Sequence, residues 1–286
     1  MIEANHVCNL YADREPGAFR KVPKDTRELY VTMLHSDEAS ELSLLGQRLK
    51  SLRKLILMHG NVEDVDFLES FQSIRVLKCL LHSLKNFSGI GKCVKLTDLI
   101  LGGSLSTAGN LACLGRLSLL ERLRLEGPHP SKGLDEIKPM RTVKALDLYA
   151  PKWSLEHVPR IFPAAELLSI SQGAYRSLDF IHALDNLAAL DIAYARKLTS
   201  FDAIGRHPRL RALKIGYAIT GLKSCAQFGC SSTVQQIEIS SCKNLRNISA
   251  FVDWPALRKV SLLRCPGIPL AQVEALRMSG REVKWG

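Results

Sequence analysis

The sequence predicts an α/β solenoid, in which short repeats of one β-strand and one tight helical return stack to form a curved parallel sheet. Three observations predict this fold class. The chain has 46 leucines among its 286 residues, but only 6% of its residues are aromatic. A Leu-x-x-Leu-x-Leu pattern recurs with a spacing of 22 to 26 residues. Apolar residues three apart fill the intervals. Because one such repeat cannot bury its leucines alone, stacked neighbours must complete the core.

The first pattern marks the strands. Strand side chains alternate, so the leucines face the core and the intervening side chains face the opposite side. Parallel strands lie about 4.8 Å apart, and returns that are wider than this spacing force the stack to curve. The expected product is a horseshoe with a concave parallel sheet. The copies begin at residues 26, 52, 74, 96, 120, 143, 165, 187, 210, 234 and 257, the first copy being degenerate.

The second pattern marks the returns, which are expected on the convex side. A spacing of three residues places apolar side chains on one side of a 3₁₀ or short helical turn. The clearest copies are Leu84/Phe87/Ile90, Leu178/Ile181/Leu184, Leu198/Phe201/Ile204 and Leu245/Ile248/Phe251.

Across residues 26–268 these repeats resemble the leucine-rich repeat family, in its short 22-residue, internalin-like form. The resemblance implies a right-handed solenoid whose usual role is protein recognition. One position departs from the family, in which an Asn after each strand binds the buried loop backbone. Without this Asn, the buried backbone groups of the loop must find other hydrogen-bond partners. We expect local irregularity at the two prolines. The last two copies resemble the cysteine variant of the repeat. The position holds Gly60, His82, Ser104, Pro128, Pro151, Gly173, Ala195, Ala218, Cys242 and Cys265.

Three segments are expected along the chain. Residues 1–25 form an N-terminal cap, residues 26–268 form about 11 repeats, and residues 269–286 form a C-terminal cap. In that cap, 269–278 predicts a short helix, because Pro is favoured at helix starts. Residues 282–285 predict a last strand with Trp285 over the final core layer. No linker separates a second domain, so we expect one cooperative unit.

The charge balance is +11, with 39 Lys and Arg against 28 Asp and Glu and a pI near 9.4. Such an excess leaves nucleic-acid or anionic-surface binding open as an alternative function. The sequence has no run of five like charges and no nucleic-acid-binding motif. A nucleic-acid partner is therefore disfavoured, and a protein partner is expected.

The eight cysteines form no CxxC pair, and the histidines recur at no metal-ligand spacing, so no metal or cofactor is expected. Cys225 and Cys230 leave a redox or metal pair open, although buried thiols are favoured there. Cys242 and Cys265 lie one repeat apart and predict stacked, buried thiols. No secretory signal or membrane span is recognisable, so we expect a cytoplasmic monomer with reduced thiols.

The sequence contains no P-loop, HExxH, GxSxG or GxGxxG motif. The glycine-rich segment 102–110 lacks the lysine of a phosphate-binding loop, and its position predicts a loop between repeats. No catalytic residue is therefore expected, and the interpretation is a non-catalytic protein-interaction scaffold.

The predicted partner-binding residues lie on the exposed sheet face, where tyrosines and apolar patches mark interfaces. One patch contains Tyr149, Tyr194, Tyr217, Asp147 and Asp191. The alternative for both patches is mutual packing across the sheet, or a cap folded over it. The protein recognition that the family resemblance implies includes effector, regulatory and toxin-neutralising roles. The second patch contains Ile56, Met58 and Leu80, with Leu81 and Ile100 beside them.

Overall fold

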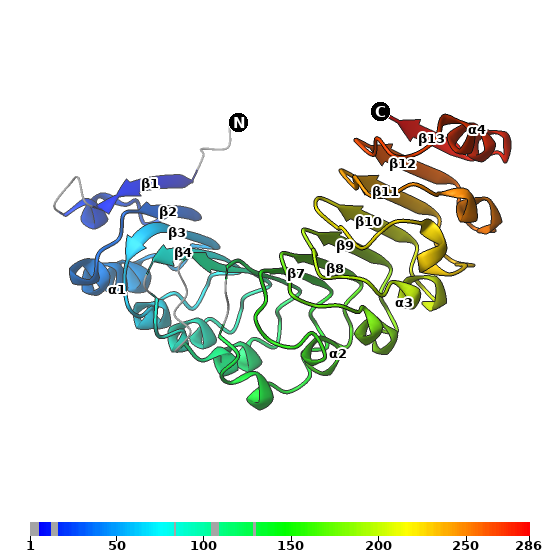
Figure 1. Ribbon diagram of the computed structural model, residues 1–286. Coiled ribbons are helices and arrows are strands. Elements are labelled where there is room, and N and C mark those ends of the chain that lie inside the picture. Colours follow the sequence, from blue (N-terminus) through cyan, green and yellow to red (C-terminus); the bar gives the residue numbers. More distant parts are fainter. Residues whose placement is uncertain (1–5, 13–16, 83, 104–108, 128–129) are drawn as a thin grey trace. The chain divides into compact units, whose positions relative to one another are not determined.

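The computed structural model describes residues 6–12, 17–82, 84–103, 109–127 and 130–286. The chain divides into two compact units, Met1–Val143 and Lys144–Gly286, and each is described by itself. Both units have the same plan (Figure 1): parallel strands follow one another in chain order on one side, and short helical returns lie on the other. The predicted leucine-rich-repeat solenoid is confirmed in this plan.

The N-terminal unit begins with a strand in the segment expected to be a cap. Its longest described helix, α1 (Ala39–Arg48), packs against the next return along the chain. The described strands are β1 (Val7–Tyr11), β2 (Glu28–Thr32), β3 (Lys54–Asn61), β4 (Val76–His82), β5 (Asp98–Gly103) and β6 (Arg122–Leu125). The other helices are η2 (Ala18–Lys21), η3 (Ser36–Glu38), η4 (Asp66–Ser70), η5 (Ser88–Lys92), η6 (Leu111–Arg116) and η7 (Leu134–Glu136).

The C-terminal unit ends with a helix and a strand, as the sequence predicts for its last segment. The strands are β7 (Ala145–Tyr149), β8 (Leu167–Ser171), β9 (Ala189–Ala193), β10 (Ala212–Gly216), β11 (Gln236–Ser240), β12 (Lys259–Leu263) and β13 (Glu282–Trp285). The helices are α2 (His157–Ile161), η8 (Asp179–Ala183), α3 (Asp202–Arg206), η9 (Cys225–Phe228), η10 (Ser249–Asp253) and α4 (Leu270–Met278).

The strand register places the repeated leucines side by side. In the C-terminal unit Leu146 pairs with Leu168, Leu168 with Leu190, and Leu190 with Leu213. Each of these four side chains is at most 2% exposed. Each leucine therefore packs between equivalent leucines of its neighbours, as the spacing predicts.

The returns bury the second apolar pattern. Phe87 directly precedes η5 and Ile90 lies within it, and both are at most 1% exposed. In the C-terminal unit the Phe201 and Phe228 rings lie 5.6 Å apart, and Phe228 stacks on Phe251 at 6.1 Å. Although aromatic residues are scarce in this chain, its nine phenylalanines are all buried, and these three fill the wider spacing of the returns.

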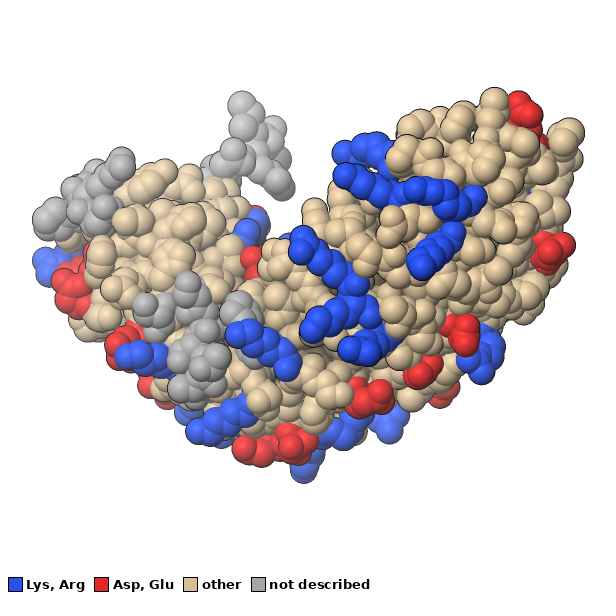
Figure 2. Space-filling model, viewed as in Figure 1, with Lys and Arg blue, Asp and Glu red and all other residues tan. Residues whose placement is uncertain are grey.

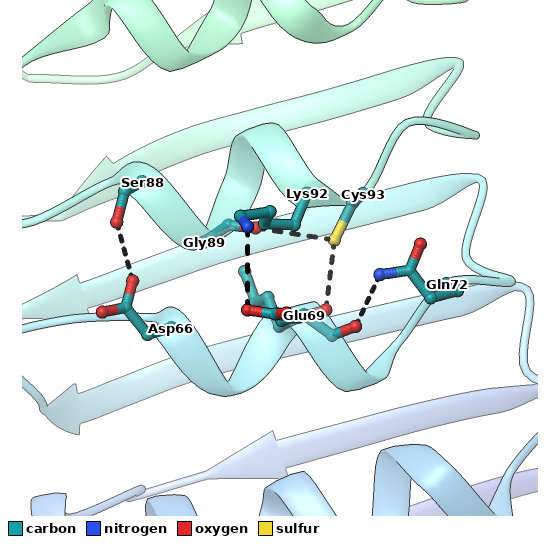
Figure 3. A network of polar contacts seen from close by, with 8 residues as sticks. Asp66, Glu69, Gln72, Ser88, Gly89, Lys92 and Cys93 are labelled. Carbon is teal, nitrogen blue, oxygen red and sulfur yellow. Dashed lines mark hydrogen bonds and ion pairs between the residues drawn. The ribbon is translucent and has the colours of Figure 1, made fainter.

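Polar contacts tie adjacent returns together at the surface, as Figure 3 shows for η4 and η5. Ser88 Oγ donates to Asp66 Oδ1 at 2.7 Å, and Lys92 Nζ lies 3.9 Å from Glu69 Oε2. The Cys93 thiol donates to the carbonyl of Leu68 at 3.5 Å. These contacts supplement the packing of the apolar layer beneath them.

Each strand of the C-terminal unit before β13, except β10, is followed by one residue in the left-handed conformation. Its amide continues the hydrogen-bonding to the next strand, as between Tyr217 N and Ser240 O at 3.0 Å. β10 is followed by two such residues, Tyr217 and Ala218. In the N-terminal unit Gly103 and Gly127 hold the same place, where glycine adopts positive φ without strain. The non-glycine residues with φ between 53° and 61° are Met33, His59, Ala150, Gln172, Tyr194, Tyr217, Ala218, Ser241 and Arg264.

Leu81 corrects one expectation, because it is fully buried rather than exposed on the sheet. β4 continues as a strand through this position, where the neighbouring strands turn left-handed, and the β3–β4 register shifts between Met58 and Asn61. Leu81 also lies so close to Gly60 that a Cβ there would be 2.8 Å from Leu81 Cδ2.

The cysteines at the family's Asn position bind backbone carbonyls. Cys242 Sγ donates to Ser240 O at 3.6 Å, and Cys265 Sγ donates to Leu263 O at 3.4 Å. Both thiols are buried, as predicted. Ser104 and Pro128 lie outside the described residues.

Trp285 pairs with Leu262 at the end of the sheet and remains 41% exposed, so it covers the last layer only in part.

Candidate partner-binding face

The sheet face opposite the returns, here called the open face, carries the predicted site. In the C-terminal unit its central column runs across the strands, one residue from each, in the observed register. Asp147 and Asp191 belong to this column, as the strand alternation predicts. The column consists of Asp147, Ser169, Asp191, Lys214, Glu238, Ser261 and Lys284.

Lys214 lies between two carboxylates of this column. Its Nζ is 3.9 Å from Asp191 Oδ2 and 3.6 Å from Glu238 Oε1. Burial raises the pKa of Asp191, Lys214 opposes that shift, and the charges of Glu238 and Asp147 add to it. Two carboxylates therefore share the Lys214 ammonium, and this part of the open face attracts a cationic group of a partner.

Tyr194 and Tyr217 form a stacked pair at the edge of the open face. Their ring centroids are 5.2 Å apart, with an angle of 11° between the planes. The Arg264 guanidinium lies 5.7 Å from the Tyr217 centroid, and its Nη2 donates to the Tyr217 hydroxyl at 3.3 Å. We call these three residues the tyrosine rim. Tyr194 remains 42% exposed although its ring is held in place.

Tyr149 stands apart from this stack and is joined to the strand beside it. Gln172 Nε2 donates to the Tyr149 hydroxyl at 2.6 Å, and Tyr149 is 37% exposed. The structure thus brings the predicted Tyr194 and Tyr217 into contact, and it links Tyr149 to Gln172. In both pairs the side chains contact each other across the sheet, and the tyrosines Tyr149 and Tyr194 also remain exposed.

Tyr175 was not predicted as part of the site. It lies in the loop after β8, and its side chain covers Gly173, where a Cβ would be 2.2 Å from the Tyr175 ring. Its hydroxyl is buried without a hydrogen-bond partner, and burial with the charge of Asp191 raises its pKa. The repeat pattern gives no signal for Tyr175, because this loop position lies outside both apolar spacings.

The apolar cluster of Ile56, Met58 and Leu80 lies on the open face of the N-terminal unit. Met58 and Leu80 are half-buried, whereas Ile56 is only 8% exposed. Leu80 reaches toward the next strand, where a Cβ on Gly102 would lie 2.8 Å from Leu80 Cδ2. Ile56 lies between Tyr30 and Lys78 in the strand register and is nearly buried, so Met58 and Leu80 offer the accessible apolar surface.

Among the described residues, no group of three or more His, Cys, Asp or Glu side chains is placed to hold a metal ion. Buried His207 accepts hydrogen bonds at Nδ1 from the amides of Arg209 and Leu210, and burial lowers its pKa. Within the described part of the chain, no helix has both the length and the hydropathy that a membrane span requires.

The chain is similar in structure to an internalin (inlF) from Listeria monocytogenes. The TM-score is 0.56 at 15% identity, over 90% of this chain and 77% of that chain. It is also similar to a chain of the Toll–Spatzle complex from Drosophila, with a TM-score of 0.54 at 12% identity, over 98% of this chain and 42% of that chain. No protein-family model matches the chain, and no curated protein matches it by sequence. At these identities the similarity concerns the fold.

Proposed function

From the leucine-rich-repeat fold of this chain, we propose that it is a non-catalytic scaffold that binds a protein partner on the open face. The observation that carries the proposal is the tyrosine rim. Tyr194 is held by its stack on Tyr217, yet 42% of it is exposed. A partner can bury this surface without paying for the ordering of a flexible side chain.

Tyrosine suits this role because it offers a large contact area with only two rotatable bonds. The carboxylates of Asp147, Asp191 and Glu238 lie in the column beside the rim and would add specificity by pairing with Arg or Lys of the partner. The combination of a rigid aromatic anchor and a charged column is typical of protein interfaces.

Two further observations support a protein ligand. The related fold in Drosophila was solved as the Toll–Spatzle complex, so this type of solenoid accommodates a protein partner. The N-terminal unit offers Met58 and Leu80 as a second apolar anchor on its own open face. The effector, regulatory or toxin-neutralising setting stays open. The proposal retains the expected cytoplasmic location, where the exposed thiol of Cys230 stays reduced.

The test is the double variant Tyr194→Ala/Tyr217→Ala. The partner is first captured from the native host on the immobilised chain and identified by mass spectrometry, and its affinity is then measured by calorimetry. We expect a loss of at least about 2 kcal/mol, the threshold of an interface hot spot. Circular dichroism should show an unchanged fold.

Val252→Ala is the control, because Val252 is 38% exposed and lies in the return η10, on the other side of the sheet. It should leave the affinity unchanged. If the double variant binds as tightly as the parent chain, the tyrosine rim is not the contact surface and the proposal fails.

A further inference from the structure

The positive charge of this chain is concentrated in one unit. Residues 144–286 contain nineteen Lys and Arg against eleven Asp and Glu, a net charge of +8 out of +11. Figure 2 shows blue side chains gathered on the visible surface of the C-terminal unit. Six exposed basic residues follow strands β8–β11, in the loops that lead from each strand into its return. We call this set the basic edge: Arg176, Arg196, Lys197, Lys223, Lys243 and Arg246.

The basic edge is not neutralised by the chain itself. Residues 172–178, 194–201, 217–224 and 241–248, which make up these loops, contain no Asp or Glu. No described carboxylate lies within ion-pair distance of any of the six residues, whereas Arg206, Lys214 and Lys259 of the same unit are paired. Like charges on successive repeats repel one another, and an anionic partner would relieve that repulsion.

The basic edge leads into a cleft at the loops after β7 and β8. The cleft has a volume of about 760 Å³, and its lining includes Lys152, Arg176 and the single carboxylate Glu156. Trp153 and Tyr175 also line it. Trp153 is 7% exposed, and neither its indole N–H nor the Tyr175 hydroxyl has a hydrogen-bond partner in the structure. Two cations and two aromatic side chains thus line the cleft at one end of the basic edge.

We propose that the basic edge binds an acidic polypeptide segment of the protein partner, with one acidic side chain at the cleft. The inference rests on the proposed function and names the chemistry of the partner. The two surfaces adjoin, because Arg196 and Lys197 lie two and three residues after Tyr194 in the loop after β9. A partner seated on the open face therefore extends over the basic edge.

Two observations favour a polypeptide over a nucleic acid. The open face beside the basic edge carries Asp147, Asp191 and Glu238, which repel a phosphate backbone but can pair with basic side chains of a polypeptide. Single-stranded nucleic acids also need free aromatic faces on which bases stack. The Tyr217 ring lies between Tyr194 and Arg264, so the stacked pair leaves only the outer face of Tyr194 for a base.

The test compares two fluorescent probes by anisotropy: a poly-glutamate peptide and a thymidine oligonucleotide of equal charge, at about 50 mM and 200 mM salt. The edge variant carries Arg196→Gln, Lys197→Gln, Lys243→Gln and Arg246→Gln. The matched control carries Arg206→Gln, Arg209→Gln, Arg211→Gln and Arg258→Gln, which removes the same charge from exposed residues that end a return or lie between a return and the next strand.

We expect the peptide to bind the parent chain and to weaken as salt rises. Since the edge variant removes four of the six charges of the basic edge, it should lose at least about tenfold in affinity. The control should lose less than about twofold. Equal losses in both variants, or no binding of the peptide at low salt, would overturn the inference. So would tighter binding of the oligonucleotide through the same four residues, because the edge would then be a nucleic-acid surface.

The experiment separates this inference from the proposed function. Tyr194→Ala/Tyr217→Ala should leave peptide binding intact, since neither tyrosine belongs to the basic edge. If that variant loses the captured partner while the edge variant keeps it, the inference fails and the proposed function stands. If the edge variant alone loses the partner, the basic edge is the contact surface and the tyrosine rim is not.

Discussion

The thiols of this chain lie in contrasting environments although two of them are close in sequence. Cys225 is buried, and its Sγ donates to Asn247 O at 3.2 Å. Cys230, five residues later, is exposed. Burial raises the pKa of Cys79, Cys93 and Cys242 to about 12, so these thiols stay protonated at ordinary pH. The expectation that both Cys225 and Cys230 are buried is wrong for Cys230.

Cys230 should therefore be the first thiol to react in the folded protein. The thiolate is the nucleophile, and a maleimide at about pH 8 should label Cys230 rapidly and Cys225 only after unfolding. Peptide mass mapping over time checks this, with Cys230→Ser as the control that removes the fast phase. Rapid labelling of Cys225 in the folded chain, or a Cys225–Cys230 disulfide, would contradict it.

Tyr217 shows how far the role of a single residue can be predicted. Tyr194 and Tyr217 occupy the same position of adjacent repeats, so their contact follows from the register alone. Arg264 occupies that position two repeats beyond Tyr217, and it contacts Tyr217 because the intervening Ser241 is short. The pattern of leucines encodes the column, but not the length of the side chains that cross it.

At the scale of one strand, β8 offers a direct test of the register. Leu167 and Leu168 are neighbours in sequence, yet Leu167 is 50% exposed on the open face and Leu168 is 2% exposed in the core. We expect Leu168→Ala to lower the free energy of unfolding by about 2–5 kcal/mol, the range for a packed leucine. Leu167→Ala should change it by less than about 0.5 kcal/mol.

Urea denaturation of the two variants measures both values. Comparable losses would mean that the strand alternation is assigned to the wrong faces. Because the two substitutions remove the same atoms from adjacent positions, differences in helix or strand propensity cannot produce the expected contrast.

The strands were predictable because the spacing of the leucines within each repeat agrees with the side-chain alternation of a strand. Strand β1 was not, since Val7–Tyr11 contains one leucine and its pairing with Glu28–Thr32 depends on Cys8 and Leu10 at the inward positions. The register shift beside Gly60 could not be predicted from the sequence either. It changes the path of β3 without changing the 22-residue interval to the next repeat, and the burial of Leu81 follows from it.

At the scale of the whole molecule, the unbroken sequence register from residue 26 to residue 262 predicts one cooperative unit. Each repeat buries its leucines only against its neighbours, so an isolated half would expose a full apolar layer. Limited proteolysis should therefore yield no stable half-fragment. A protected fragment that ends near Val143, the boundary of the first compact unit, would contradict this prediction if it folds alone.

The net charge of +11 follows from the composition, but the composition does not locate it. Basic residues recur two to six positions after the left-handed residue in successive repeats, and aligning the loops rather than the leucines makes this visible. The cleft beside Trp153 could not be predicted in the same way. It depends on how two irregular loops pack, and no periodic pattern describes them.

The left-handed residues that follow the strands restrict which side chains the chain can present there. A β-branched residue is a strained outlier at positive φ, and none of the nine described non-glycine residues with this conformation is Val, Ile or Thr. The residue types observed with this conformation, apart from glycine, are Met, His, Ala, Gln, Tyr, Ser and Arg. Substitutions among these side chains can change what the position binds without changing the backbone. The backbone conformation therefore limits which partners such substitutions can select.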